Sequence, residues 1–120
     1  MAWLLVAIFG GLGAITRYML DRAIMGRLTT EFPIGTLVIN LSGAFLLGIV
    51  VGLGTRGLLP TNVSIAIGDG FIGAYTTFST LTFESLALAS EGSISFGVVN
   101  MLGTVVLATF LAYLGIHLAH

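Results

Sequence analysis

The sequence predicts an all-α membrane protein with four transmembrane helices in each subunit and a third helix that is broken within the membrane. Of its 120 residues, 57% are hydrophobic and 8% are charged, and the mean hydropathy is +1.11. Soluble domains carry about 25% charged residues. Residues 2–16, 32–55, 70–83 and 92–120 contain no Asp, Glu, Lys or Arg. Because a helix needs roughly 20 apolar residues to cross a bilayer, we expect four crossings in one domain spanning residues 1–120.

The first two predicted helices cover residues 2–20 and 33–54. No basic segment precedes Trp3, so we expect the first to be a permanent span rather than a cleaved signal peptide. It ends at the charged residues Arg17, Asp21 and Arg22. Pro33 suits the first turn of the second helix, where a missing N–H costs nothing.

The third predicted helix, residues 62–90, exceeds one crossing by about a third. Its middle combines Gly70 and Gly73 with a dense group of hydroxyl side chains. Membranes tolerate non-helical backbone only where it is buried in protein or lines a wet cavity. We therefore expect a break around residues 70–80, the alternative being a long tilted helix. The hydroxyl residues are Thr76, Thr77, Ser79, Thr80 and Thr82.

The fourth predicted helix covers residues 93–117, and it carries two neutral polar side chains four residues apart, Asn100 and Thr104. This spacing places them on one helix face. Such a pair of hydrogen-bond donors suits a partly dehydrated small anion, although two unrelated packing contacts would give the same pattern. Asn40 in the second helix leaves a similar choice between an inter-helix hydrogen bond and a polar path.

Two further side chains are candidates for function. Phe78 lies among the hydroxyl residues of the third helix. Its ring either packs against lipid or presents its positive edge to an anion. Arg17 either extends its charge to the membrane interface or attracts anions to a vestibule. Asp69, between two glycines, has no assigned role at this stage.

Composition argues against several other classes of protein. There is no cysteine, and the histidines are His117 and His120, so neither a nucleophile–base set for an enzyme nor a side-chain metal cluster is expected. The formal net charge of −1 without a basic run argues against nucleic acid as a partner.

Three stretches together resemble the signatures of the Fluc/CrcB fluoride channels. They are GGLGAITRY at residues 10–18, GTLVINLSGAFLLG at 35–48 and GFIGAYTTFST at 70–80. Their order and spacing in a four-span chain of this length make the resemblance specific. It implies a multi-pass protein of the cell inner (plasma) membrane that exports toxic fluoride passively and so confers fluoride resistance. The implied assembly is an antiparallel, dual-topology homodimer with two pores.

The resemblance also implies roles for individual residues. A structural Na⁺ at the dimer centre would be held by the main-chain carbonyls of Gly73 and Thr76 from both subunits, as suits a hard cation. The residues that match positions along the fluoride pore are Arg17, Asn40, Phe78, Ser79, Thr80, Asn100 and Thr104.

The chain departs from the family pattern at two positions. Leu81 stands where the family has a second phenylalanine, and Ala108 stands where a hydroxyl usually follows Thr104. A rival interpretation is a small multidrug-resistance-type exporter coupled to protons, but the first helix has no acid before Asp21. A third interpretation is a non-conducting assembly protein. It gives no reason for neutral hydrogen-bond donors within the membrane, which cost free energy when they are buried without a polar partner.

Overall fold

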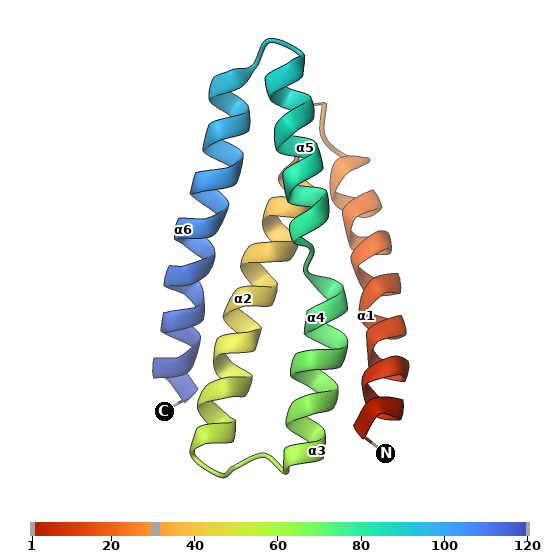
Figure 1. The fold of residues 1–120 in the computed structure, drawn as a ribbon, viewed down its shortest axis with the longest axis vertical. Helices are drawn as coiled ribbons and strands as arrows, with labels where there is room; N and C mark the ends of the chain where they lie inside the picture. The colour runs from red at the N-terminus through yellow and green to blue at the C-terminus, as the bar shows by residue number, and fades with distance from the viewer. Residues whose placement is uncertain (1, 30–31, 120) are drawn as a thin grey trace.

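The computed structural model describes residues 2–29 and 32–119, and the regular elements within them are helices joined by short turns. The long helices are α1 (Ala2–Met25), α2 (Ile34–Thr55) and α6 (Ile94–Ala119). Between α2 and α6 lie α3 (Thr61–Ser64), η1 (Ile65–Ile72), α4 (Gly73–Tyr75) and α5 (Phe78–Ser90). The helices run alongside one another in an elongated bundle of 48 × 28 × 22 Å (Figure 1).

Three of these helices are long and apolar enough to span a membrane, namely α1, α2 and α6. Their outer faces expose large hydrophobic side chains such as Trp3, Val51 and Val106. An apolar exterior of this kind suits lipid rather than water. The three spans make the protein a multi-pass membrane protein.

Helix α1 continues to Met25, past the expected end near Leu20. Asp21 and Arg22 therefore mark a change of environment rather than the end of the helix, because charged side chains are compatible with helical backbone. Arg22 donates from Nη1 to the Tyr18 hydroxyl one turn earlier, at 3.1 Å, and its guanidinium carbon lies 5.7 Å from the Tyr18 ring centre.

Helices α2 and α6 pack closely through glycines. A Cβ atom at Gly48 would overlap the Ala112 carbonyl of α6, and a Cβ at Gly115 would overlap the Phe45 carbonyl of α2. Gly13 of α1 meets the Phe71 carbonyl of η1 in the same way. Small residues allow helix backbones to approach to this extent in membrane proteins. The glycines thus fix the spacing around the interrupted helical path.

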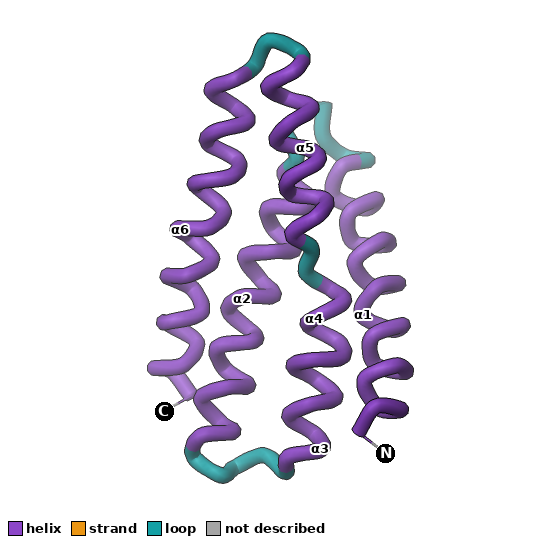
Figure 2. Tube along the Cα trace, in the orientation of Figure 1, coloured by secondary structure: helices purple, strands orange, loops and turns teal. Residues whose placement is uncertain are grey.

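The path from Thr61 to Ser90 is helical in two pieces that meet at Thr76 and Thr77. Pro60 precedes α3, and no side-chain hydrogen bond caps the start of this helix. Residues 65–72 form a wide π-helical segment, and the helix ends after Tyr75. Figure 2 shows the short non-helical connection between α4 and α5 halfway along the bundle.

Candidate functional site

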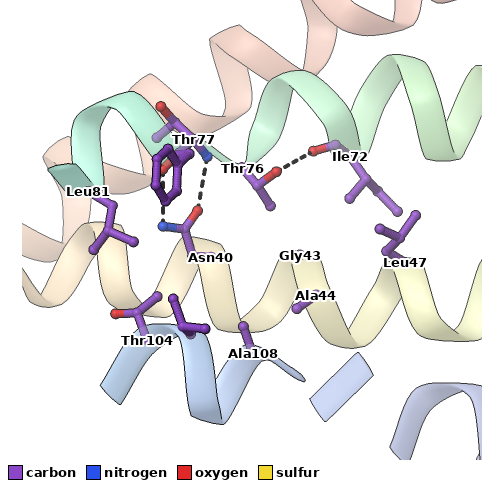
Figure 3. A pocket seen from close by; sticks show the side chains of 12 residues that line it. Asn40, Gly43, Ala44, Leu47, Ile72, Thr76, Thr77, Leu81, Thr104 and Ala108 are labelled. Carbon is purple, nitrogen blue, oxygen red and sulfur yellow. Dashed lines mark hydrogen bonds between the residues drawn. The ribbon is translucent and has the colours of Figure 1, made fainter. Parts of the chain in front are cut away.

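The connection between α4 and α5 is held by the side chain of Asn40. Thr76 (φ −83°, ψ 159°) and Thr77 (φ −153°, ψ 120°) are both extended. Asn40 Nδ2 donates to the Thr77 carbonyl at 3.2 Å, and the Thr77 N–H donates to Asn40 Oδ1 at 2.9 Å (Figure 3). In a continuous helix that N–H would bond the carbonyl of Gly73. The buried amide of α2 therefore replaces hydrogen bonds that the interruption removes.

The same connection starts α5 with a capping hydroxyl. Thr77 Oγ1 accepts a hydrogen bond from the Thr80 N–H at 3.2 Å and donates to Thr80 Oγ1 at the same distance. This is the N-cap arrangement that satisfies an orphan donor of a helix start. The hydroxyl of Thr80, which the sequence assigns to the pore, therefore accepts a hydrogen bond from the Thr77 hydroxyl. The side chain of Ser79 lies outside the described part of the structure.

Arg17 lies beside the end of α4 rather than at the end of its own helix. Its Nε donates to the Ala74 carbonyl at 3.3 Å, and the side chain is partly buried. Carbonyls in the last turn of a helix carry partial negative charge, which a cation stabilises. The guanidinium therefore supports the interrupted backbone from the side of α1, while Asn40 supports it from α2.

Asn100 and Thr104 face inward from α6, with exposed fractions of 1% and 3%. Asn100 Nδ2 donates to Ser85 Oγ of α5 at 2.8 Å. Asn100 Oδ1, Thr104 Oγ1 and Glu84 Oε1 are buried and have no hydrogen-bond partner among the residues described. Buried polar atoms are nearly always paired, because each orphan costs free energy. Of the three residues, Thr104 also lines the cavity beside the Thr76–Thr77 connection.

A cavity of about 260 Å³ lies between the Thr76–Thr77 connection, α2 and α6. Figure 3 shows Asn40 between the connection and the helix that carries Thr104 and Ala108. No charged side chain is among the twelve residues that line the cavity. They are Asn40, Gly43, Ala44, Leu47, Ile72, Thr76, Thr77, Phe78, Leu81, Thr104, Val105 and Ala108.

The two departures from the family pattern both line this cavity. Leu81 is buried at 3% exposure, whereas Phe78, the first residue of α5, is 68% exposed. Ala108 gives the cavity wall an apolar side chain where the family usually has a hydroxyl. The hydroxyl of the next residue, Thr109, donates to the Val105 carbonyl of its own helix at 2.8 Å.

The main chain at the connection has a carbonyl oxygen that leaves the helical hydrogen-bond ladder. The extended conformation of Thr76 takes its carbonyl out of the helical ladder, and the Thr77 N–H donates to Asn40 Oδ1. Gly73 is exposed. Carbonyl oxygens are hard ligands that suit alkali and alkaline-earth cations. Within residues 2–29 and 32–119 there is no group of three His, Cys, Asp or Glu side chains that could hold a metal ion.

The sequence singled out Asn40 and Asn100 but not Thr77 and Ser85, the residues with which their side chains form hydrogen bonds. Thr77 was one of five hydroxyl residues, and nothing in its spacing distinguished the residue that caps α5. Ser85 partners Asn100 across fifteen residues of chain, a pairing that requires the turn between α5 and α6. Ser42 contacts the Tyr75 hydroxyl at 2.9 Å and so adds a further link from α2 to the end of α4.

An interrupted helical path, a cavity beside it without charged side chains and three helices able to span a membrane define an integral membrane protein. The sequence profile of the family described as "CrcB-like protein, Camphor Resistance (CrcB)" matches residues 4–116. The chain belongs to this family.

Curated relatives cover nearly the whole chain. The "Fluoride-specific ion channel FluC 2" of Moorella thermoacetica is 44% identical over 115 residues, 96% of this chain and 93% of the relative. The "Fluoride-specific ion channel FluC" of Solibacter usitatus is 42% identical over 120 residues, 99% of this chain and 98% of the relative. A Mycobacterium bovis protein named "Fluoride-specific ion channel FluC 2" is 40% identical over 113 residues, which cover 94% of this chain and 86% of the relative.

Proposed function

We propose that this protein is a fluoride-specific ion channel of the inner (plasma) membrane that lets fluoride leave the cell passively. It is a channel rather than an enzyme, in keeping with the names of its relatives. The observation that carries the proposal is the buried hydroxyl of Thr104, which has no hydrogen-bond partner among the described residues and belongs to a cavity wall without fixed charge. A neutral O–H can point its hydrogen toward an anion. Because it carries no full positive charge, it binds the anion less tightly than a cationic side chain does, so the anion can leave again.

The permeation path in this proposal runs along the faces of α2, α5 and α6 that meet at the cavity. Thr104 and Asn100 supply polar groups on α6, and Asn40 lines the path while it holds the connection. Phe78 stands at the rim, where the positive edge of its ring favours an anion. Ser79 and Thr80 continue the path along α5, and Arg17 raises the local anion concentration.

The complete assembly in this proposal is an antiparallel homodimer of dual topology with two pores. Residues 61–90 form the fourth crossing, with the Thr76–Thr77 connection at mid-membrane. The support is that the cavity wall and the exposed Phe78 lie on a surface that one subunit leaves open. Non-helical backbone and orphan polar atoms require protein or water around them in a bilayer. A second copy supplies that cover.

The dimer centre in this proposal holds a structural Na⁺. Its ligands are the Gly73 and Thr76 carbonyls of both subunits. The ion compensates the partial negative charge of carbonyls that lose their helical N–H donors at the interruption. The ligand set fits the ion because its oxygens are main-chain and uncharged, which suits a monovalent hard cation. Asn40 and Arg17 hold the backbone that presents these oxygens.

Purified protein in liposomes tests the function directly. With valinomycin present to carry K⁺, we expect the vesicles to release F⁻ while Cl⁻ remains trapped. Empty liposomes provide the background rate. Absence of F⁻ release, together with transport of a labelled quaternary ammonium ion driven by a pH gradient, would contradict the channel and favour a proton-coupled exporter.

Thr104→Val is expected to lower the F⁻ efflux rate about tenfold, which corresponds to the loss of one hydrogen bond to a charged partner. Stability should be unchanged or slightly higher, because the lost hydroxyl has no protein partner. Thr109→Val is the matched control, since its hydroxyl bonds only its own helix. Equal flux in the two variants would remove Thr104 from the path.

A further inference from the structure

A pair of hydroxyl groups joins α2 to the last residue of α4. Ser42 Oγ and Tyr75 Oη lie 2.9 Å apart, and Ser42 Oγ also donates to the Ile39 carbonyl of its own helix at 3.1 Å. Because a hydroxyl has a single hydrogen, Tyr75 is the donor between the two and Ser42 the acceptor. Tyr75 is 6% exposed, and a buried phenol without an acceptor would cost free energy. The pair therefore holds the end of α4 against α2.

The residues next to this pair are also in contact across the two helices. A Cβ atom at Gly43 of α2 would overlap the methyl group of Thr76 and would lie 3.3 Å from the Tyr75 ring. Figure 3 shows Gly43 opposite Thr76. Asn40 holds Thr77 by two hydrogen bonds. The consecutive residues 75–77, at the end of α4 and in the connection, are thus all in contact with α2.

Thr76 follows the position of α4. Its N–H and its Oγ1 both donate to the Ile72 carbonyl, at 3.0 Å and 3.1 Å. Gly73, the other residue with a proposed sodium ligand, is the first residue of α4. The proposed site requires the Gly73 and Thr76 carbonyls of both subunits to converge on one ion. A displacement of α4 relative to α2 therefore changes the distances between the ion and its ligands.

We propose that Ser42 and Tyr75 are positioning residues that set the Na⁺ affinity of this site without contacting the ion. The inference rests on the sodium site of the proposed function. Groups behind the ligands of a metal affect its affinity because they hold those ligands in place. The Phe71 ring packs against the Tyr75 ring, with 6.0 Å between the ring centres and 17° between the ring planes. Removal of the Tyr75 hydroxyl therefore leaves the ring packed and removes only the hydrogen bond to Ser42.

The test measures the Na⁺ concentration that gives half-maximal thermal protection of the purified protein in detergent. Tyr75→Phe is expected to raise this concentration about fivefold, which corresponds to the loss of one neutral hydrogen bond. Ser42→Ala is expected to raise it at least as much, because it leaves the buried Tyr75 hydroxyl without its acceptor. The double variant should show no larger shift than Ser42→Ala, since the two changes remove one interaction. Ser42→Thr keeps a hydroxyl and should retain the wild-type value.

Tyr113→Phe is the matched control for the loss of a phenol hydroxyl. It makes the same change at a tyrosine of α6 that is 59% exposed, and the half-maximal Na⁺ concentration should stay at the wild-type value. A shift as large as that of Tyr75→Phe would overturn the proposal. Fluoride efflux at saturating Na⁺ should remain close to wild type in every variant, which shows that each has folded and tests the channel separately.

The results distinguish this inference from the proposed function. A purely structural hydroxyl pair would lower the unfolding temperature equally with and without Na⁺. Unchanged half-maximal concentrations in Tyr75→Phe and Ser42→Ala would therefore overturn the positioning role while leaving the sodium site intact. Shifts that multiply in the double variant would show that the two residues do not act as a pair. Absence of any Na⁺ protection in the wild-type protein would overturn the sodium site and this inference together, whereas fluoride efflux would still test the channel.

Discussion

Asn40→Asp is expected to abolish fluoride efflux, by at least about 100-fold, and to destabilise the protein by about 3–5 kcal/mol, as an uncompensated buried charge does. The amide uses both of its ends, since Nδ2 donates to the Thr77 carbonyl and Oδ1 accepts from the Thr77 N–H. A carboxylate keeps the acceptor but places a second oxygen against the Thr77 carbonyl. It also adds a negative charge to the wall of an anion cavity.

The measurements are F⁻ efflux from liposomes and the amount of monodisperse protein that survives heating in detergent. Asn62→Asp is the matched control, because it makes the same exchange at an exposed residue in the first turn of α3. A negative charge there is favourable at a helix start. Asn40→Leu separates the two causes, since it loses both hydrogen bonds without adding charge. Wild-type flux in Asn40→Asp would exclude Asn40 from both of its proposed roles.

Gly48→Ala is expected to destabilise the protein by about 3 kcal/mol or more, the upper range for overpacking, because the added methyl meets main chain. A Cβ at this position overlaps the Ala112 carbonyl of α6, and the carbonyl oxygen cannot move aside as a flexible side chain could. Separation of α2 from α6 would also displace Thr104 relative to Asn40. Fluoride efflux should therefore fall together with stability.

Gly103→Ala provides the control for this substitution. It lies on α6, as Ala112 does, and a Cβ there meets no atom within 4 Å. Alanine also has the higher helix propensity, so stability should be equal or slightly greater. A Gly48→Ala variant as heat-resistant as Gly103→Ala would show that the α2–α6 contact does not limit stability.

Several features of the fold were readable from sequence because they depend on local pattern. The charge-free stretches predicted apolar helices, and α1, α2 and α6 are the spans that composition and length identify. The glycine and hydroxyl density of residues 70–80 indicated irregular backbone, and the structure interrupts its helices at Thr76 and Thr77. Similarity to three family motifs was likewise present in the residues, and the family match over residues 4–116 confirmed it.

The partners of the polar side chains could not be predicted in the same way. Asn40 and Thr77 are thirty-seven residues apart, and Arg17 and Ala74 fifty-seven. Whether an amide in a helix bonds a neighbour or lines a path depends on which backbone group faces it, and that is decided by helix packing. All the residue assignments remain predictions, for the sodium site Gly73 and Thr76 and for the pore Arg17, Asn40, Phe78, Ser79, Thr80, Asn100 and Thr104.

The amino-acid sequence by itself determined where the chain enters apolar surroundings, where its backbone is irregular and to which family it belongs, because hydropathy and local motifs are properties of contiguous residues. Only the tertiary structure decided that Asn40 and Arg17 support the irregular backbone from two sides and that the Thr104 hydroxyl has no hydrogen-bond partner among the described residues. The physical reason is that hydrogen-bond satisfaction is a property of pairs, and here the pairs form across helices whose spacing glycine contacts set.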